Sequence, residues 1–567
     1  MYRLQPLVDI AELCHRQGLR DVILSPGSRC APLTLAFARH PHLRVRSIPD
    51  ERAAAFIALG LAQQTGQPVV LVCTSGTAAL NYGPAVAEAF YQNVPLLLLT
   101  ADRPPEWIDQ WDGQTIRQAH VYGRHAKWSR ELPVSYEHPD AAWHINRQVN
   151  EAINYARETP AGPVHLNIPV REPFYPDPAE PYGYSDAVRV IAMSADAPEL
   201  SEAQYRALRD EWQTYERILV VAGQGRPTAA FRQVLKRLSE KTGAVLVGDV
   251  LSNLHDLPGV VDRPDALLMK GEQAALQPDL LITFGQSVIS KNLKLFLRKH
   301  APRAHWHVQP AGEVPDTFQT LTRVIRTEPS RFFSRVSRGL RASPRSYAET
   351  WRAANQRVRQ ATDRFFQHQP FGEFGALSAV VQHLPKGTQV HVANSMAIRY
   401  VNFLGLPARR DLTLFANRGT SGIDGSSSTA VGAALATNQP VVLITGDLAF
   451  FYDRNAFWHQ EPLPNLRIVL LNNHGGGIFR MIDGPRQQPE LEPFFETRQA
   501  LRAENTARDF GMTYYFAEGK EALRRHLPDF FNQTSDRPRL LEIETHNLTN
   551  ADVFDQYKQM LRAGEKL

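Results

Sequence analysis

The sequence of 567 residues has only three cysteines, Cys14, Cys30 and Cys73, and none of them stands in a short CxxC spacing. This scarcity argues against a disulfide framework or a zinc site and favours a reducing cytoplasm. No apolar run approaches the roughly 18 residues that a membrane-spanning helix needs, so no membrane span is predicted. The first residues, MYRLQPLVDIAELCHRQG, have the apolar spacing of a first helix of the fold and do not resemble a signal peptide.

Blocks of basic residues are also missing, although the net charge is +5 and the sequence pI is about 9.0. The lysines and arginines are dispersed and do not alternate with aromatic residues, so nucleic acid is a weak interpretation of the charge. Small anionic substrates would account for it equally well. A hydrophobic fraction of 43% with 21% charged residues is typical of a soluble globular protein.

Short apolar runs that end on Gly, Ser, Asn or Asp recur along the chain and alternate with helical patterns. Examples are VVLVCTSGT in the first third, AVLVGDV in the middle and VVLITGDL in the last third. Such runs are typical of parallel strands covered by helices on both faces. Breaks in composition at about residues 173–198 and 341–346 divide the chain. The sequence therefore predicts an α/β fold with three doubly wound parallel-sheet domains, residues 1–180, 195–340 and 350–567.

Polar residues follow two neighbouring strands of the last third. Asp447 comes directly after VVLITG, and Asn472 and Asn473 end RIVLLNN, one strand–helix–strand crossover later. The two strand ends are therefore expected on one sheet edge. There, with the Gly475 carbonyl, they could hold Mg²⁺, and the N–H groups after Gly446 could bind a diphosphate. Taken alone, Asp447 would more often be an N-capping residue and the Asn-rich strand end an ordinary Asn-Gly turn. Their separation by one crossover favours a binding site.

Gly-Asp followed by Asn-Asn resembles the metal and diphosphate motif of thiamine-diphosphate enzymes, with Leu448 in place of the usual third glycine. That family combines a pyrimidine-binding, a central and a diphosphate-binding domain, in the order of the three predicted domains. It also implies a catalytic glutamate early in the pyrimidine domain. Glu51, in SIPDERAAAFIALG, takes this place and is expected to hydrogen-bond the pyrimidine ring of the cofactor. Without the resemblance, Glu51 would be a carboxylate favoured at a helix N-terminus.

The resemblance implies thiamine diphosphate with Mg²⁺ (or Mn²⁺) as cofactors. It implies Asp447, Asn473 and Gly475 as metal ligands. Besides Glu51, the cofactor-binding residues that it implies lie in the last domain: Ser395, Met396, Ile423, Asp447, Leu448, Ala449, Asn473, Gly475, Ile478 and Phe479. In the central domain, VVAGQGRP has Thr228 where a dinucleotide-binding loop has glycine, so neither FAD nor NAD is predicted there.

Five further strings, PGSR, TSGTA, ADRPPE, IRQ and NRGTSGIDG, resemble one family of these enzymes. It is the 2-succinyl-5-enolpyruvyl-6-hydroxy-3-cyclohexene-1-carboxylate (SEPHCHC) synthase family of menaquinone biosynthesis. The resemblance implies a transferase that decarboxylates 2-oxoglutarate and adds the remaining four-carbon unit to isochorismate. The substrate-binding residues that it implies are Ser28, Arg29, Arg103, Gln114, Lys291, Arg399 and Arg418. Cys30 departs from the family, in which a hydroxyl residue is common at this position.

Arginine suits two dicarboxylate substrates, because its planar fork binds carboxylates bidentately. If NSMAIR begins a helix, Ser395 and Arg399 share one face. Arg399, supported by Arg418, would then meet the distal carboxylate of 2-oxoglutarate, whereas Arg29 and Arg103 would face isochorismate. Each of these cations has an alternative role as a solvated surface charge or an internal salt bridge.

Two other functions stay open from the sequence. One is a different thiamine-diphosphate enzyme, of the 2-oxoacid decarboxylase or acetohydroxyacid synthase type, although paired arginines count against a site for pyruvate alone. The other is a nucleotide-binding regulatory or scaffold protein on the same fold, which would have no need of Glu51. The resemblance further implies a homodimer or a dimer of dimers, in which Glu51 of one subunit acts opposite Asp447 of its partner.

Overall fold

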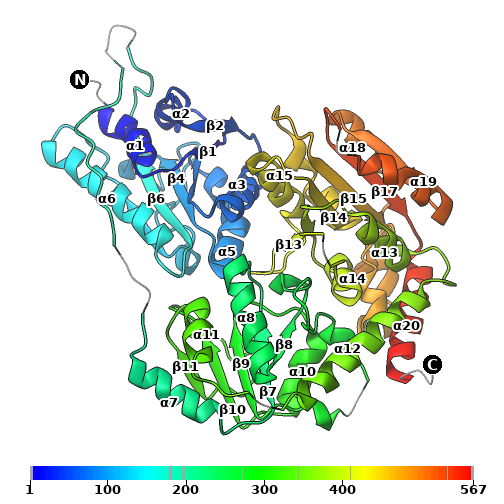
Figure 1. The fold of residues 1–567 in the computed structure, drawn as a ribbon. Coiled ribbons are helices and arrows are strands. Elements are labelled where there is room, and N and C mark those ends of the chain that lie inside the picture. The colour runs from blue at the N-terminus through cyan, green and yellow to red at the C-terminus, as the bar shows by residue number, and fades with distance from the viewer. Residues whose placement is uncertain are drawn as a thin grey trace.

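The computed structural model describes residues 4–177, 182–194, 198–270, 273–342, 344–408, 410–532 and 534–563. The predicted domain limits at residues 1, 180, 195 and 567 lie outside these ranges. Three parallel sheets follow one another along the described chain, which confirms the predicted α/β class. In Figure 1 the first domain (blue and cyan), the middle domain (green) and the last domain (yellow to red) lie side by side around a common centre.

The first domain has a six-stranded sheet in the order β2-β1-β3-β4-β6-β5. Its strands are β1 (Asp21–Leu24), β2 (Arg44–Ser47), β3 (Val69–Cys73), β4 (Leu96–Asp102), β5 (Trp128–Glu131) and β6 (Pro163–Pro169). Its helices are α1 (Gln5–Arg16), α2 (Ala31–Ala38), α3 (Glu51–Thr65), α4 (Thr77–Asn81), α5 (Gly83–Gln92) and α6 (Pro139–Arg157), with the 3-10 turns η1 (Pro105–Trp107) and η2 (Gly123–His125). Helix α1 buries its apolar face, as its spacing predicts.

The middle domain has a five-stranded sheet in the order β11-β10-β9-β7-β8. Its strands are β7 (Ile218–Ala222), β8 (Val245–Gly248), β9 (Leu280–Phe284), β10 (Ala304–Val308) and β11 (Arg323–Ile325). Its helices are α7 (Glu202–Trp212), α8 (Ala229–Thr242), α9 (Pro264–Leu267), α10 (Lys291–Lys299) and α11 (Pro329–Ser337), with η3 (Val250–Ser252) and η4 (Ala274–Leu276). Helix α12 (Ser346–Phe365) leads into the last domain, where the Thr362 hydroxyl lies 2.8 Å from that of Tyr557.

The last domain repeats the topology of the first, because its order β13-β12-β14-β15-β17-β16 is the first order with each strand number raised by 11. Its strands are β12 (Gln389–Val392), β13 (Thr413–Phe415), β14 (Val441–Gly446), β15 (Leu466–Asn472), β16 (Thr513–Ala517) and β17 (Arg539–Glu544). Its helical segments are α13 (Glu373–His383), α14 (Met396–Leu404), α15 (Ser426–Ala436), α16 (Asp447–Tyr452), η5 (Arg454–Phe457), α17 (Ile478–Met481), η6 (Pro485–Gln487), η7 (Leu491–Glu496, a π-helix), α18 (Glu504–Asp509), α19 (Lys520–Phe530) and α20 (Asn547–Ala563).

The two outer domains meet where α3 crosses α15 (Figure 1). A Cβ atom on Gly60 of α3 would lie 2.1 Å from the Thr429 carbonyl oxygen, and one on Gly432 of α15 would lie 2.1 Å from that of Ile57. Only glycine therefore allows the two backbones to approach so closely. The apolar core continues across this contact, since one cluster includes Phe56 and residues of α15. The crossing fixes how the two outer sheets lie relative to each other.

Candidate active site

The ends of four adjacent strands carry most of the predicted site residues of the last domain. Strands β14 and β15 pair in parallel, with Gly446 opposite Leu471. This confirms the prediction that Asp447 and Asn473 leave the sheet at one edge. Strand β12, which Ser395 follows, lies on the other side of β14, and β13 lies beyond it. The carboxyl ends of these strands form one continuous edge, where open α/β sheets bind ligands.

The Asp447 carboxylate is buried at the first residue of α16, with 2% of the residue exposed. Nε2 of Gln499 donates to its Oδ2 at 2.7 Å. Burial raises the pKa of this carboxyl, and hydrogen bonds from Gln499 and from the backbone of Leu448 and Gly475 oppose that shift. A buried carboxylate of this kind could provide one anionic ligand for a cation.

The Asn473 side chain lies between this carboxylate and a second acid. Its Oδ1 accepts from the Gly475 N–H at 3.1 Å, and its Nδ2 donates to Oε1 of Glu373 at 2.6 Å. The Gly475 backbone thus contacts both Asp447 and Asn473, which brings the carboxylate and amide oxygens to one place. The pKa of Glu373 is raised to about 7, chiefly by burial; the hydrogen bond from Asn473 opposes this shift and the charge of Asp447 adds to it.

Asn472 has a structural place in the same network. Its Nδ2 donates to Glu542 at 2.6 Å and to the Leu501 carbonyl at 3.0 Å, and its Oδ1 accepts from Gln499 at 3.2 Å. The described residues contain no group of three or more His, Cys, Asp or Glu side chains that could hold a metal. A cation at Asp447 would therefore take its other protein ligands from amide and carbonyl oxygens, as Asn473 and Gly475 could supply.

The three glycines after His474 pack against protein atoms. A Cβ atom on Gly475 would lie 2.7 Å from the Glu496 carbonyl oxygen, and one on Gly477 would lie 2.6 Å from Oδ1 of Asn547. The Gly476 N–H donates to the Glu496 carbonyl at 2.6 Å. The close packing of the segment that contains η7 thus requires Gly475 and Gly476, and the packing of Asn547 at the start of α20 requires Gly477. Gly446 differs, because a Cβ atom there would meet no described protein atom within 4 Å.

Ser395 has the backbone conformation φ 68°, ψ −130° directly before α14. A non-glycine residue with positive φ is strained, and such strain collects at ligand sites. The other predicted cofactor-binding residues surround this edge with different exposure: Met396 and Ala449 are buried, Leu448, Ile478 and Phe479 are intermediate, and Ile423 is 40% exposed.

Arg399 and Arg418 form a cationic pair beside Ser395. Nη1 of Arg399 donates to the Ser395 carbonyl at 2.6 Å, and Nη1 of Arg418 donates to Oδ1 of Asn394 at 2.8 Å. Burial lowers the pKa of both guanidinium groups, and the charge of Arg418 lowers the pKa of Arg399 further. Nε of Arg418 is buried and has no hydrogen-bond partner among the described residues. Two such cations favour an anion between them.

The middle domain contributes a lysine that sequence reasoning missed. The predicted Lys291 begins α10, is exposed, and makes no hydrogen bond or ion pair within the described chain. Lys294 is half-buried one turn later. Burial lowers the pKa of Lys294, Asp249 raises it, and the charge of Arg418 lowers it. The structure thus brings Lys294 into electrostatic contact with Arg418, whereas the side chain of Lys291 is solvated.

The two predicted arginines of the first domain also lie together. Arg29 follows β1 and is 6% exposed, and its Nη1 donates to the Val170 carbonyl at 2.8 Å. Its guanidinium stacks on the Phe174 ring at 4.5 Å. Arg103 follows β4 and pairs with Asp112 at 3.1 Å. Burial lowers the pKa of Arg29, and the charge of Arg103 adds to this effect.

The remaining predicted substrate residues of this domain, Ser28 and Gln114, are exposed. Gln114 has φ 56°. Gln118, which the sequence analysis did not select, is fully buried and donates to the carbonyl of Ala101 and to Oδ1 of Asn167, each at 2.9 Å. Its Oε1 accepts from the Gly76 N–H at 3.0 Å. It holds the loop that carries Gln114 against the sheet.

Glu51 is the first residue of α3, and its carboxylate makes no hydrogen bond or ion pair with other described residues. Its neighbours are held within the chain. Asp50 accepts from Nδ2 of Asn455 at 2.8 Å, and Nη2 of Arg52 donates to the Tyr452 carbonyl at 2.7 Å. The N-terminus of α3 thus contacts the C-terminal end of α16, while Asp447 lies at the other end of that helix.

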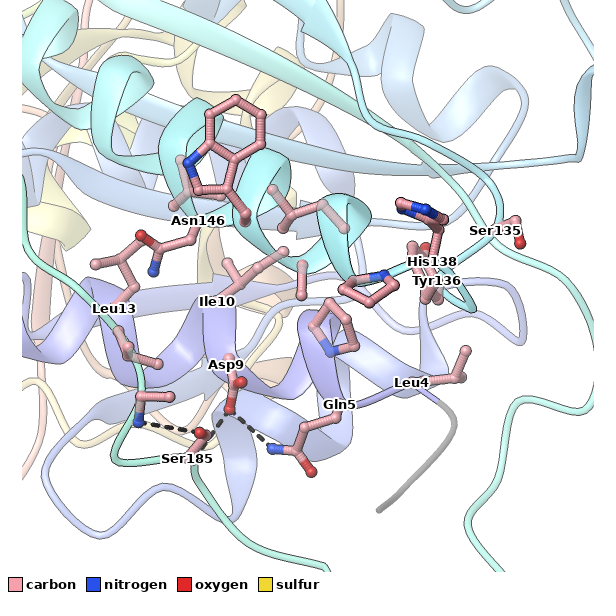
Figure 2. Close-up of a pocket in the computed structure, with 18 of the residues that line it drawn as sticks. Leu4, Gln5, Asp9, Ile10, Leu13, Ser135, Tyr136, His138, Asn146 and Ser185 are labelled. Atoms are coloured by element: carbon pink, nitrogen blue, oxygen red, sulfur yellow. Dashed lines mark hydrogen bonds between the residues drawn. The ribbon is translucent and has the colours of Figure 1, made fainter.

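A cavity of about 830 Å³ lies elsewhere, on the first domain between α1, α6 and residues 185–189. Figure 2 shows Gln5, Asp9 and Ser185 gathered at one side of it, where Asp9 accepts from Nε2 of Gln5 at 2.8 Å and from the Ser185 N–H at 3.0 Å. No predicted site residue is among those that line it. The strand-end site is therefore distinct from this cavity.

Comparisons with known proteins define the class. Residues 8–121 match the thiamine pyrophosphate enzyme N-terminal TPP binding domain, residues 194–392 the middle domain, and residues 396–543 the C-terminal TPP binding domain. An X-ray structure described as a thiamin diphosphate-dependent enzyme from Mycobacterium smegmatis has the same fold, with a TM-score of 0.72 at 19% identity over 95% of this chain and 99% of that one. The protein is a thiamine pyrophosphate enzyme by fold and domain content.

Full-length relatives define the family. The chain is 45% identical to the SEPHCHC synthase of Cytophaga hutchinsonii, over 99% of both chains. It is 38% identical to the SEPHCHC synthase of Porphyromonas gingivalis, over 97% of this chain and 96% of that one. It is 37% identical to that of Flavobacterium johnsoniae, over 97% of both. The chain belongs to the SEPHCHC synthase family. No helix in the described part of the chain is long and apolar enough to span a membrane.

Proposed function

We propose that this protein decarboxylates 2-oxoglutarate and joins the remaining four-carbon unit to isochorismate, giving SEPHCHC and CO₂ in menaquinone biosynthesis. Membership of the family supports the reaction. The observation within the chain that carries it is the cationic pair Arg399 and Arg418 at the strand ends of the last domain. A site for two dicarboxylates needs such a concentration of positive charge, and a site for pyruvate alone does not.

The strand-end residues fit thiamine diphosphate and a divalent cation, Mg²⁺ or Mn²⁺. Asp447 would provide the anionic metal ligand, and Asn473 and the Gly475 carbonyl would provide neutral oxygens. The open space beside Gly446 and the N–H groups that begin α16 suit a diphosphate. When bound, the cofactor supplies the nucleophilic carbon and the electron sink for decarboxylation. Ser395, Met396, Ile423, Leu448, Ala449, Ile478 and Phe479 would line its two rings and diphosphate.

The protein's own residues would orient the substrates. Arg399 and Arg418 would bind the distal carboxylate of 2-oxoglutarate. Arg29 and Arg103, with Ser28 and Gln114 on the same face of the first domain, would bind isochorismate. Lys291 was implied by family resemblance; the half-buried Lys294 is the better-placed lysine of α10 for an anion near Arg418. Apolar side chains such as Ile478 would keep water from the reacting carbon, which would otherwise be protonated.

Glu51 would hydrogen-bond the pyrimidine ring of the cofactor and exchange a proton with that ring when the cofactor is activated. We expect this contact across the interface of a homodimer, or of a dimer of dimers, with Asp447 in the other subunit. The absence of any partner for Glu51 among the described residues supports this, as does the exposure of Ile423 and Tyr452, at 40% and 53%. We also propose domain limits of 1–180, 195–340 and 350–567, and a cytoplasmic location.

The proposed function is tested by incubating the protein with thiamine diphosphate, Mg²⁺, 2-oxoglutarate and isochorismate and identifying the product by mass. We expect SEPHCHC and an equimolar amount of CO₂. Pyruvate in place of 2-oxoglutarate is the control, because an enzyme of the acetohydroxyacid synthase type would use pyruvate and leave isochorismate unchanged. Consumption of pyruvate alone would overturn the proposal.

A further inference from the structure

Glu88 of α5 is a buried carboxylate with no role in the proposed reaction. The residue is 1% exposed, belongs to the first domain and directs its oxygens at a turn of the last domain. Oε1 accepts from the Gly419 N–H at 2.7 Å, and Oε2 accepts from the Thr420 N–H at 2.6 Å and from its hydroxyl at 2.5 Å. Hydrogen bonds to an ionised carboxylate are the strong ones, so these three form a clamp on the turn.

The turn is shaped to receive this carboxylate. A Cβ atom on Gly419 would lie 2.7 Å from the Glu88 carbonyl oxygen and 3.0 Å from its Oε1, so a larger residue would push α5 and the turn apart. Glu88 is also tied to its own helix, because Nε2 of Gln92 donates to Oε1 at 2.5 Å. Gln92 in turn accepts from Nε2 of Gln224 in the middle domain at 3.1 Å. One polar face of α5 therefore links all three domains.

Arg418 directly precedes the clamped residues and is held from the other side by Asn394. Nδ2 of Asn394 donates to the carbonyls of Asn417 at 2.7 Å and Gly422 at 2.6 Å, while its Oδ1 accepts from Arg418. The backbone at Arg418 is thus fixed between Asn394 and Glu88. Nε of the Arg418 guanidinium is buried and has no hydrogen-bond partner in the described chain. The guanidinium is therefore held in place, but its hydrogen-bonding capacity is only partly used.

We propose that Glu88 is a positioning residue that holds Arg418 where it binds the distal carboxylate of the 2-oxo acid. The inference rests on the proposed function of Arg418. Glu88 itself touches no substrate. Its effect passes through the backbone of the Gly419–Thr420 turn, and a displacement of about 1 Å at a binding group is enough to cost much of its contribution. The first domain thus acts on 2-oxo acid binding in the last domain through one carboxylate.

The test uses Glu88→Gln in the full-length holoenzyme. The glutamine side chain has one NH₂ group in place of a carboxylate oxygen. This NH₂ group faces the N–H of either Gly419 or Thr420, and because two donors cannot bond each other, that hydrogen bond is lost. We expect faster amide hydrogen exchange in residues 416–424 and a rise of about tenfold in KM for 2-oxoglutarate. The affinity for thiamine diphosphate, followed by thermal shift, should change less than about twofold, because Ile423 is the only residue proposed to bind the cofactor that lies in this segment, and of the described residues there Glu88 contacts only Gly419 and Thr420.

Two further variants keep the test decisive. Thr420→Val removes only the hydroxyl–carboxylate bond, so it should shift hydrogen exchange and KM in the same direction by a smaller factor. This variant still tests the proposal if Glu88→Gln folds poorly. Gln63→Met removes a bond to Gln92, at 3.1 Å, that does not touch the turn, and should leave both measurements unchanged. A loss of kcat with unchanged KM, or unchanged exchange in residues 416–424, would overturn the proposal. If the wild type makes no SEPHCHC, the proposed function fails, while the exchange result still decides whether Glu88 holds the turn.

Discussion

Asn473 donates an amide N–H to Oε1 of Glu373 at 2.6 Å, although the two residues are 100 positions apart in the chain. Because the carboxyl group accepts the Nδ2 hydrogen, the amide is oriented with its Oδ1 toward Gly475 and Asp447. The amide oxygen is thereby presented to the place where a cation would bind. Outer contacts of this kind fix the direction of a metal ligand, and their loss typically weakens metal binding by about 10- to 100-fold.

Glu373→Ala should therefore weaken Mg²⁺-dependent binding of thiamine diphosphate by about tenfold or more. Glu373→Gln is the matched control, because its amide oxygen can still accept from Asn473. The measurement is the Mg²⁺ concentration needed for half of the thermal shift caused by the cofactor. Equal Mg²⁺ requirements in wild type and Glu373→Ala would show that the contact does not orient Asn473 for the metal.

Asp447→Asn should abolish the Mg²⁺-dependent thermal shift, because it removes the only carboxylate proposed to bind the cation. The apo variant should unfold at a temperature no lower than wild type, since burial raises the pKa of Asp447 and its charge is therefore unfavourable in the folded apo protein. Asp509→Asn, which loses an exposed pair with Arg454, is the control and should keep the full shift. A normal cofactor-induced shift in Asp447→Asn would mean that the metal assignment is wrong.

The stability of the apo protein should depend on pH through Asp453. This carboxyl is fully buried against Ser428, and burial raises its pKa to about 7 from an ordinary value of 3.8. A raised pKa means that the folded state holds the proton more tightly. The stabilising contribution is complete below pH 3.8 and is lost as the pH rises through about 7.

Asp453→Asn cannot lose a proton and should escape this loss. Between about pH 5 and about pH 7 the free energy of unfolding of the wild type should fall relative to that of the variant by up to about 1.4 kcal/mol per pH unit, and the melting temperature should fall with it. Thermal unfolding across this range measures the difference. A constant gap between the two proteins would show that Asp453 does not titrate there.

The sequence was sufficient for features that depend on order along the chain. Asp447 and Asn473 could be placed on one edge because a strand–helix–strand crossover makes consecutive parallel strands neighbours. The Ala-rich segment after Glu51 could be assigned to a closely packed helix, and α3 is buried along most of its length. The three parallel sheets followed from the alternation of apolar strands and helices along the chain.

Features that depend on packing between distant segments could not be predicted. Glu373 and Glu88 look like ordinary helix carboxylates in FGEFG and AVAEAF, and only the approach of another domain or strand end buries them. The local sequence predicts a substrate-binding lysine at the start of α10. Whether this is Lys291 or Lys294 depends on which side of the helix faces Arg418. The sequence likewise does not reveal that the Glu496 carbonyl occupies the space beside Gly475.

Gly60→Ala should destabilise the protein by about 1–3 kcal/mol or more, because the added Cβ would lie 2.1 Å from the Thr429 carbonyl oxygen at the crossing of α3 and α15. Gly83→Ala is the control, since a Cβ atom there meets nothing within 4 Å and should be neutral or slightly stabilising. Denaturant unfolding of both variants gives the comparison. Equal stability of Gly60→Ala and wild type would mean that the outer domains can separate at this crossing without cost.

The two arginine pairs should distinguish the two dicarboxylate substrates. Arg399 lies beside Ser395 and Arg418 in the last domain, whereas Arg29 and Arg103 lie at strand ends of the first. A hydrogen bond to a charged group is worth about 1.5–3 kcal/mol, or about 10- to 150-fold in binding. Arg399→Ala should therefore lower kcat/KM for 2-oxoglutarate by about that factor, with a smaller effect on isochorismate, and Arg29→Ala should do the reverse. Arg298→Ala, on an exposed turn of α10 where the guanidinium donates to the Thr317 carbonyl, is a control of equal charge change. Steady-state kinetics with each substrate varied in turn decides the assignment: if Arg399→Ala changes only the dependence on isochorismate, the two pairs serve the opposite substrates.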